Sequence, residues 1–260
     1  MQTIKQLNAL TARIVRQNLT NADTIITVIA MPMFMLLFFV YVLGGNIATA
    51  SGSSSATTYL RYALPGFLLL TMAMSSAYTS LRINNDRTSG FLNRLHSLPI
   101  PRWVILGSHV LASLIFMLLA ELAVFVVGLI MGYRVHATIG SLLLFVGLSV
   151  LFGLAITLLA IPFSLKADNY ASAGGFSYVL LMLLFVSSAL MPTKGMAKAV
   201  QIFADHQPMT PIVNTARKLL DHSVTLSHNT PMIAGIWLVA GMIIFAILSY
   251  RVYAKMYLTK

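Results

Sequence analysis

The chain has 260 residues, of which 58% are hydrophobic and 9% are charged, and its net charge of +11 comes from 17 Lys and Arg against 6 Asp and Glu. A soluble domain carries about 25% charged residues, so this composition excludes an ordinary soluble protein and predicts one that resides in a lipid bilayer. The positive charge is then typical of loops that face an anionic cytoplasmic leaflet, and no nucleic-acid partner is expected. The absence of cysteine excludes disulfides and thiolate chemistry.

The N-terminal segment, residues 1–23, is polar and has no apolar stretch before a small-residue cleavage site, so we expect no cleaved signal peptide. Within it, Ile4, Leu7, Leu10 and Ile14 fall near one helical face. This pattern predicts an amphipathic helix that lies in the inner membrane interface. The alternative is a frayed polar terminus.

Six apolar stretches follow, and each approaches the roughly 20 residues that a helix needs to cross about 30 Å of hydrocarbon. The fifth is diluted by Gly and Ser at its start, which is common where membrane helices pack closely. The predicted spans are 24–43, 60–81, 103–131, 139–165, 171–190 and 232–253. The sequence therefore predicts an all-α membrane protein of six transmembrane helices in a single domain, residues 1–260. The Gly- and Ser-rich segment 44–58 is predicted to be a flexible extracellular connector.

The loop between the second and third spans, residues 84–102, is far more charged than its flanks. It carries a short apolar stripe at helical spacing, and two prolines then stop the helix. The stripe consists of Phe91, Leu92, Leu95 and Leu98, and the prolines are Pro99 and Pro101. We expect a short helix parallel to the membrane, whose apolar face must be buried against something.

Glu121 is the acidic residue that lies well inside a predicted span. A charge at bilayer depth costs about 2.5–3.5 kcal/mol on insertion scales, so this side chain should face the interior of the helix bundle. It either contacts a substrate or proton, or makes a structural hydrogen bond to a neighbouring helix. The sequence leaves both interpretations open.

The segment before the last span, residues 191–231, is too polar to cross the membrane. Residues 199–203 and 212–220 are nevertheless amphipathic, and Pro208 and Pro211 break the chain between them. This pattern predicts two short helices that dip into the outer leaflet, where their backbone must be covered by protein or touch water.

Orientation follows from the Lys and Arg residues of the connecting segments, most of which fall on the side that holds both termini. The positive-inside rule therefore predicts a multi-pass protein of the plasma membrane with both termini in the cytoplasm.

The sequence contains no phosphate-binding loop of the form G-x-x-x-x-G-K-[ST] and no hydrolase, zinc-protease or dinucleotide motif. We therefore expect no ATPase site, no other enzymatic activity and no bound cofactor in this chain. Four histidines fall outside, and a metal cluster there is the alternative to ordinary solvated loop histidines, which we favour. They are His136, His206, His222 and His228.

Four stretches of this chain resemble the permease subunits of ABC-2 type transporters, and among these the daunorubicin-resistance-like drug exporters. The stretches are RQNLTNADTIITVIAMPMFMLLFFVYVLGG (16–45), YLRYALPGFLLLTM (59–72), NDRTSGFLNRLHSLPIPR (85–102) and HQPMTPIVNTARKLL (206–220). The last two are the most specific. The resemblance implies the six-helix ABC-2 (type V exporter) transmembrane domain, with residues 191–231 as re-entrant helices.

The resemblance also implies partners. Residues 84–98 would form a coupling helix that docks on a separate P-loop ATPase, which would use ATP and Mg²⁺. Two ATPase subunits and a second permease subunit, identical or different, would complete the exporter. The implied coupling residues are Asp86, Arg87, Gly90, Phe91, Leu92, Arg94, Leu95, Pro99 and Pro101. Among these, Phe91, Leu92 and Leu95 would be packing anchors, and Asp86, Arg87 and Arg94 would fix the register through charge pairs.

A substrate path and an outer gate are implied in the same way. The path residues are Met72, Met74, Tyr78, Glu121, Tyr178 and Phe185, and the gate residues are Pro208, Pro211 and Arg217. The expected function is ATP-driven export of amphipathic drugs, antibiotics or other hydrophobic small molecules, in contact with membrane lipids. Export of a lipid, glycolipid or polysaccharide is the alternative. An ion-coupled secondary transporter or an integral membrane enzyme would need midplane ion sites or a catalytic cluster, and neither is evident.

Overall fold

The computed structural model describes residues 2–44 and 56–257, so the predicted connector 44–58 lies, apart from its ends, outside the described residues. The described part of the chain is helical and contains no strand, only an isolated bridge between His136 and Asp221. Five helices in it are long and apolar enough to cross a membrane.

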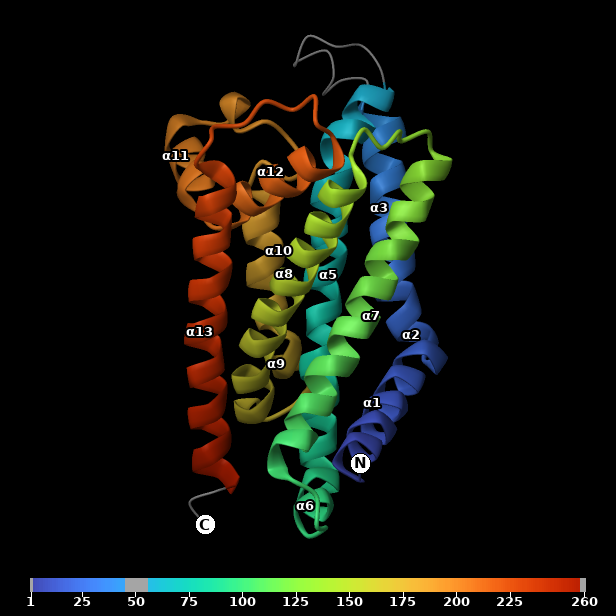
Figure 1. The fold of residues 1–260 in the computed structure, drawn as a ribbon, viewed down its shortest axis with the longest axis vertical. Coiled ribbons are helices and arrows are strands. Elements are labelled where there is room, and N and C mark those ends of the chain that lie inside the picture. Colours follow the sequence, from blue (N-terminus) through green and yellow to red (C-terminus); the bar gives the residue numbers. More distant parts are fainter. Residues whose placement is uncertain (1, 45–55, 258–260) are drawn as a thin grey trace.

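The chain begins with α1 (Gln2–Thr20), which ends at Asn21. There the backbone is extended, and the Asn21 side chain accepts a 3.1 Å hydrogen bond from the Thr24 amide, which caps the next helix. Because of this break, α1 leaves the line of the first span at an angle and packs along α7 (Figure 1). The amphipathic N-terminal helix is therefore present, and its placement in the membrane interface stays a prediction.

The first span is continuous but not uniformly α-helical. It consists of α2 (Ala22–Ile25), the π-helix η1 (Ile26–Ala30), α3 (Met31–Phe38) and the π-helix η2 (Phe39–Leu43). Pro32 is the second residue after η1, and the Met31 amide donates to the Ile26 carbonyl, five residues back. Because proline lacks an N–H and its ring collides with the preceding turn, a locally widened helix accommodates it here.

Four further helices have the length of a span: α5 (Ala56–Thr88), α7 (Arg102–Ile130), α8 (Ile139–Lys166) and α13 (Thr230–Tyr257). Of these, α5 is the central one, because it packs against α7, α8, α9, α10 and α12. Its N-terminal half supplies much of the core, including Leu60, Leu64 and Phe67, all with 1% exposure or less.

The predicted fifth span, residues 171–190, is only partly helical. The chain forms α9 (Tyr170–Gly174) and α10 (Phe176–Phe185), a run of 16 residues or about 24 Å, which is shorter than the hydrocarbon core. Residues 186–190 then form turns, and four of the five are buried. Six full-length helical spans are therefore not observed, because this segment ends early in a serine-containing turn inside the protein.

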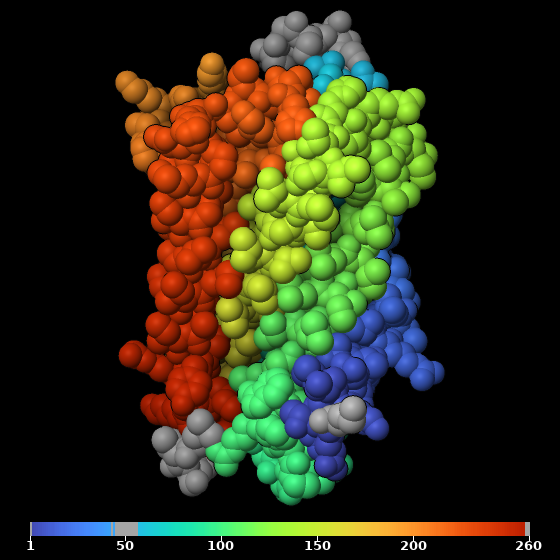
Figure 2. Space-filling model, viewed as in Figure 1, coloured from blue at the N-terminus to red at the C-terminus, as the bar shows by residue number. Residues whose placement is uncertain are grey.

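The two ends of the molecule differ. Gln2, Tyr257 and the short helix α6 (Phe91–His96) lie at one end, whereas α11 (Lys198–His206) and α12 (Met209–Leu220) lie at the other (Figure 1). In the space-filling view, α13 forms one edge and α1 lies toward the opposite edge (Figure 2). The single turn η3 (Thr193–Gly195) precedes α11. The break between α11 and α12 is at Gln207 and Pro208, while Pro211 lies in the first turn of α12, where a missing N–H is harmless.

Gly66 lets the buried turn approach α5. A Cβ atom added to Gly66 would lie 2.4 Å from the Ala189 carbonyl oxygen and 2.9 Å from its Cα atom. These are backbone atoms and cannot rotate away, so only glycine fits this position.

We predict that Gly66→Ala destabilises the protein by about 1–3 kcal/mol, the usual cost of overpacking. Thermal unfolding in detergent should show a lower midpoint. Gly147→Ala in α8 is the matched control, because nothing lies within 4 Å of its added Cβ and alanine favours a helix. Equal midpoints for the two variants would contradict the close approach.

Candidate functional site

A buried carboxylate organises the end of the molecule that holds α6. Asp86 is 4% exposed, and Arg13 of α1 donates to both of its oxygens, each at 3.1 Å. His109 Nε2 of α7 lies 3.5 Å from Asp86 Oδ2. The Arg13 guanidinium also lies 3.9 Å above the ring of Phe91. One side chain near the end of α5 thus connects α1, α6 and α7.

Neighbouring residues on α5 hold two other segments. Asn84 Nδ2 donates to the Ser164 and Ala167 carbonyls, at 3.1 and 2.8 Å, and Arg87 also donates to the Ala167 carbonyl. The last carbonyls of a helix have no backbone donor within it, and these side chains supply the missing donors at the end of α8. On the other side, Arg82 Nε donates to Asn18 Oδ1 of α1 at 2.9 Å. Asp86 and Arg87 therefore belong to the last turns of α5 rather than to a separate helix.

The predicted helix 84–98 is observed as two elements joined by a turn. After α5 ends at Thr88, Gly90 adopts a φ of +74°, which favours glycine, and α6 begins at Phe91. Leu92 and Leu95 are 1% and 7% exposed and pack with apolar residues of α5, α7, α8 and α13. Leu92 and Leu95 are thus buried by their own chain, contrary to the expectation that they face a partner, whereas Leu98 of the same stripe is 51% exposed.

The helix α6 is also tied to the end of α13. His96 Nε2 lies 2.6 Å from the Tyr253 hydroxyl, and its ring stacks on Tyr257 at 4.4 Å. The side chains that α6 and the next residues leave exposed are Asn93, Arg94, Ser97, Leu98, Pro99 and Pro101. Of the predicted coupling residues, Arg94, Pro99 and Pro101 are exposed, Arg87, Gly90 and Phe91 are partly buried, and the others are buried. Whether they touch an ATPase stays a prediction.

Three of the predicted path residues meet in one groove. Met74, Tyr78 and Tyr178 line a hollow of about 250 Å³ between α5 on one side and α9 and α10 on the other. The Tyr78 hydroxyl lies 3.2 Å from Asp23 Oδ2, an acidic residue at the start of the first span that the sequence analysis did not single out. We call this hollow the α5–α10 groove.

The other three path residues lie elsewhere. Met72 is fully buried in the core beside Gly153, and Phe185 does not line the groove. Glu121 is 5% exposed and accepts a 2.8 Å hydrogen bond from Ser149 Oγ of α8. This contact joins two helices and favours the structural interpretation of Glu121.

At the other end, buried side chains satisfy the turn that follows α10. Arg217 is 4% exposed and donates to the Tyr62 and Ser188 carbonyls, each at 2.9 Å. Tyr59 donates to Leu190 O at 2.9 Å, and Gln207 Nε2 donates to Leu183 O at 2.7 Å. The carbonyls at the end of α10 and in the following turn are therefore paired with side chains of α5, of α12 and of Gln207 between α11 and α12. We call this set of contacts the outer cap.

An ion pair adjoins the outer cap. Arg61 donates to Asp221 Oδ2 from Nε at 3.1 Å and from a terminal nitrogen at 2.5 Å. Burial acts to raise the pKa of Asp221, but hydrogen bonds from Ser223 and the charge of Arg61 outweigh it and hold the pKa below its usual value. The carboxylate is therefore ionised at neutral pH and anchors the chain after α12 to α5.

The gate residues are thus placed in different surroundings. Arg217 is the centre of the outer cap, Pro208 precedes α12, and Pro211 is buried in it. Among the outer histidines, His222 Nε2 lies 3.0 Å from Ser141 Oγ. Within residues 2–44 and 56–257, no three His, Asp or Glu side chains are grouped so that they could share a metal ion.

The sequence is similar to those of known membrane transport proteins. Residues 5–220 match the family described as ABC-2 type transporter. The chain is 26% identical to the daunorubicin resistance ABC transporter permease of Streptomyces coeruleorubidus over 242 residues, which cover 88% of this chain and 79% of that protein. It is also 26% identical to a protein of Mycobacterium tuberculosis named as a doxorubicin resistance ABC transporter permease, with 93% and 83% covered. A protein of Cyanophora paradoxa named as a transport permease is 29% identical, with 85% and 76% covered.

We predict that Arg217→Met destabilises the outer cap, because it leaves two buried carbonyls without a donor, at about 1–3 kcal/mol for each. The midpoint of thermal unfolding should fall markedly. Lys218→Met, on the next and more exposed residue, removes the same charge and should have little effect. If both variants unfold at the wild-type temperature, the outer cap does not hold the turn.

Proposed function

The chain belongs to the ABC-2 type transporter family, and we propose that it is the permease subunit of an ATP-driven exporter of amphipathic drugs or other hydrophobic compounds. The observation that carries this proposal is the similarity, along most of the chain, to permeases named for daunorubicin and doxorubicin resistance. The long apolar helices agree with a multi-pass membrane protein. In this proposal both termini and α6 face the cytoplasm.

The energy source in this proposal is a separate P-loop ATPase, present in two copies, which binds ATP and Mg²⁺. Support comes from the sequence, which lacks a phosphate-binding loop, and from the exposed tip of α6. Arg94 and Leu98 are exposed there next to Pro99, and a charged and an apolar side chain side by side suit a protein partner.

A force on α6 would also move the helices to which it is bonded. The helix is joined to α1 and α7 through Arg13 and Asp86 and to α13 through His96 and Tyr253. Its inner face is packed among buried apolar residues. We infer that ATPase closure moves this end as one body, and that the displacement travels along α5.

The α5–α10 groove is the proposed contact site for the substrate. It combines tyrosine hydroxyls with Met and aliphatic side chains, which suits an amphipathic molecule. The first span next to it exposes Phe34 and Tyr41, each 64% exposed. A second permease subunit, identical or different, would cover this apolar face and enclose the groove between two chains.

We predict that the double variant Arg94→Glu/Leu98→Asp weakens binding of the partner ATPase at least tenfold, because it reverses a charge and places a carboxylate on an apolar contact. Pull-down of a co-expressed candidate P-loop ATPase measures this. Arg16→Glu, an exposed arginine of α1, is the control and should bind normally. Full binding by the double variant, with the control unchanged, would place the docking site elsewhere.

We predict that Tyr178→Ala lowers ATP-dependent uptake of a daunorubicin-type drug into inverted vesicles by about tenfold or more, because loss of a ring and hydroxyl removes about 1.5–3 kcal/mol of contact. The measurement uses vesicles that contain this chain and its ATPase. Tyr250→Ala is the matched control, since Tyr250 is similarly exposed, at 67% against 73%, but lies on α13, outside the groove. Equal uptake by wild type and Tyr178→Ala, across drugs and lipids alike, refutes the groove as the path.

A further inference from the structure

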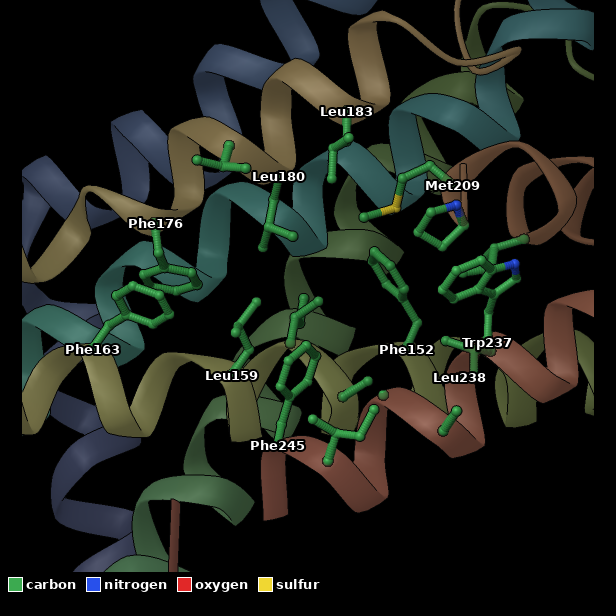
Figure 3. A pocket seen from close by; sticks show the side chains of 18 residues that line it. Phe152, Leu159, Phe163, Phe176, Leu180, Leu183, Met209, Trp237, Leu238 and Phe245 are labelled. Carbon is green, nitrogen blue, oxygen red and sulfur yellow. The ribbon is translucent and has the colours of Figure 1, made fainter. Parts of the chain in front are cut away.

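A second, wholly different cavity lies between α8, α10, α12 and α13. It has a volume of about 400 Å³, and its lining is apolar throughout (Figure 3). Phe152 and Leu159 enter it from α8, Leu180 from α10, and Trp237 and Phe245 from α13. None of its lining residues belongs to the α5–α10 groove.

The cavity has a defined end toward α6. Phe163 of α8 stacks on Phe176 of α10 with ring centroids 5.5 Å apart (Figure 3). Phe163 also lines the next hollow, of about 370 Å³, together with Lys166 and Leu248. These two residues in turn line a third hollow, of about 490 Å³, with Arg251 and Lys255. Shared side chains therefore place one apolar and two partly basic hollows in a row along α8 and α13.

The lining of the hollows changes from apolar to partly basic toward the end of α8. Lys166, Arg251 and Lys255 are exposed near the ends of α8 and α13. Asp168 is the acidic residue that lines these two hollows. Among these lining residues, basic side chains thus outnumber acidic ones beside an apolar cavity. From Leu248 to Trp237 there are eleven residues of helix, about 17 Å, which is close to one leaflet of the hydrocarbon core, about 15 Å.

We propose that this row of hollows is a binding site for an anionic phospholipid. One acyl chain occupies the apolar cavity, and the phosphate lies against Lys166 and Arg251, with Lys255 at the rim. The physical basis is charge complementarity at the membrane surface together with an apolar cavity that adjoins the basic hollows along α8 and α13. Basic hollows between membrane helices are suited to phosphate head groups. A bound lipid would fill the space between α10 and α13, and this inference does not depend on what the protein transports.

The occupant is expected to be anionic rather than zwitterionic. Each basic residue near the membrane surface contributes about 1 kcal/mol toward an anionic head group, or roughly a fivefold preference. Two such residues should therefore favour phosphatidylglycerol over phosphatidylcholine of the same acyl chains by about tenfold or more. The apolar cavity alone would not distinguish the two lipids.

Trp237 provides the measurement because it lines the cavity and the chain has only two tryptophans. In a Trp103→Phe background, the full-length protein in neutral detergent is titrated with brominated phosphatidylglycerol or phosphatidylcholine. Quenching of Trp237 should occur at about tenfold lower mole fraction of the anionic lipid. Equal quenching by both lipids would overturn the proposal.

Two variant pairs separate the head-group site from general surface charge and the cavity from general lipid contact. Lys166→Gln/Arg251→Gln should abolish the preference for the anionic lipid, whereas Lys5→Gln/Arg16→Gln, which removes two exposed charges from α1, should preserve it.

Ala240→Phe fills the cavity and should reduce quenching, whereas Ala246→Phe, on the exposed side of the same helix, should not. If the two charge variants behave alike, or Ala240→Phe quenches like wild type, the site is not the one proposed. Gel filtration confirms that each variant is folded.

Discussion

The structure depends on one constraint, which is that a backbone polar group at membrane depth must find a partner inside the protein. Most of the chain meets it with regular helices, but the segment after Phe185 does not continue as a helix. Its carbonyls instead accept hydrogen bonds from Arg217 of α12, from Tyr59 of α5 and from Gln207, which lies between α11 and α12. The polar helices at this end are therefore required by the unfinished span, and they can change position only if these bonds are replaced.

Each end of the molecule has a buried charged side chain at its centre, and the two charges have opposite signs. At the α6 end a buried carboxylate, Asp86, is the centre, and its partners are Arg13 and His109. At the other end a buried guanidinium, Arg217, is the centre, and its partners are carbonyl oxygens. Removing Asp86 leaves the buried His109 and the Arg13 guanidinium without their carboxylate, which is more costly than losing an exposed pair. Removing Arg217 leaves buried carbonyls without a donor. Both ends are therefore rigid, and α5 contributes residues to each.

Hydrophobic runs in the sequence predicted most of the fold, because the length of an apolar run is set by the thickness of the bilayer. The predicted spans 103–131, 139–165 and 232–253 agree with α7, α8 and α13 within a few residues at each end. The run 171–190 was misleading, since hydropathy cannot separate a full helix from a short helix followed by a turn that other side chains cover. The turn depends on two residues that are distant from it in sequence. Gly66 leaves room for the backbone of Ala189, and Arg217 donates to the Ser188 carbonyl.

The candidate sites were predicted less well, for a related reason. Spacing showed that residues 91–95 have an apolar face, but not that α5, α7, α8 and α13 already cover it. Met74, Tyr78 and Tyr178 do share a groove, whereas Met72, two residues before Met74, points into the core. The difference of two residues corresponds to about 200° around a helix, so only the packing of α5 determines which of them reaches the groove.

These placements give α5 a specific mechanical role. Its inner turns hold α1, α6 and the end of α8, its middle forms one wall of the α5–α10 groove, and its outer turns hold the buried turn. A single helix that is buried along most of its length cannot bend without disturbing its neighbours. Movement at α6 should therefore reach the groove and the outer cap together, and in the proposed exporter this would couple access on one side to release on the other through one helix.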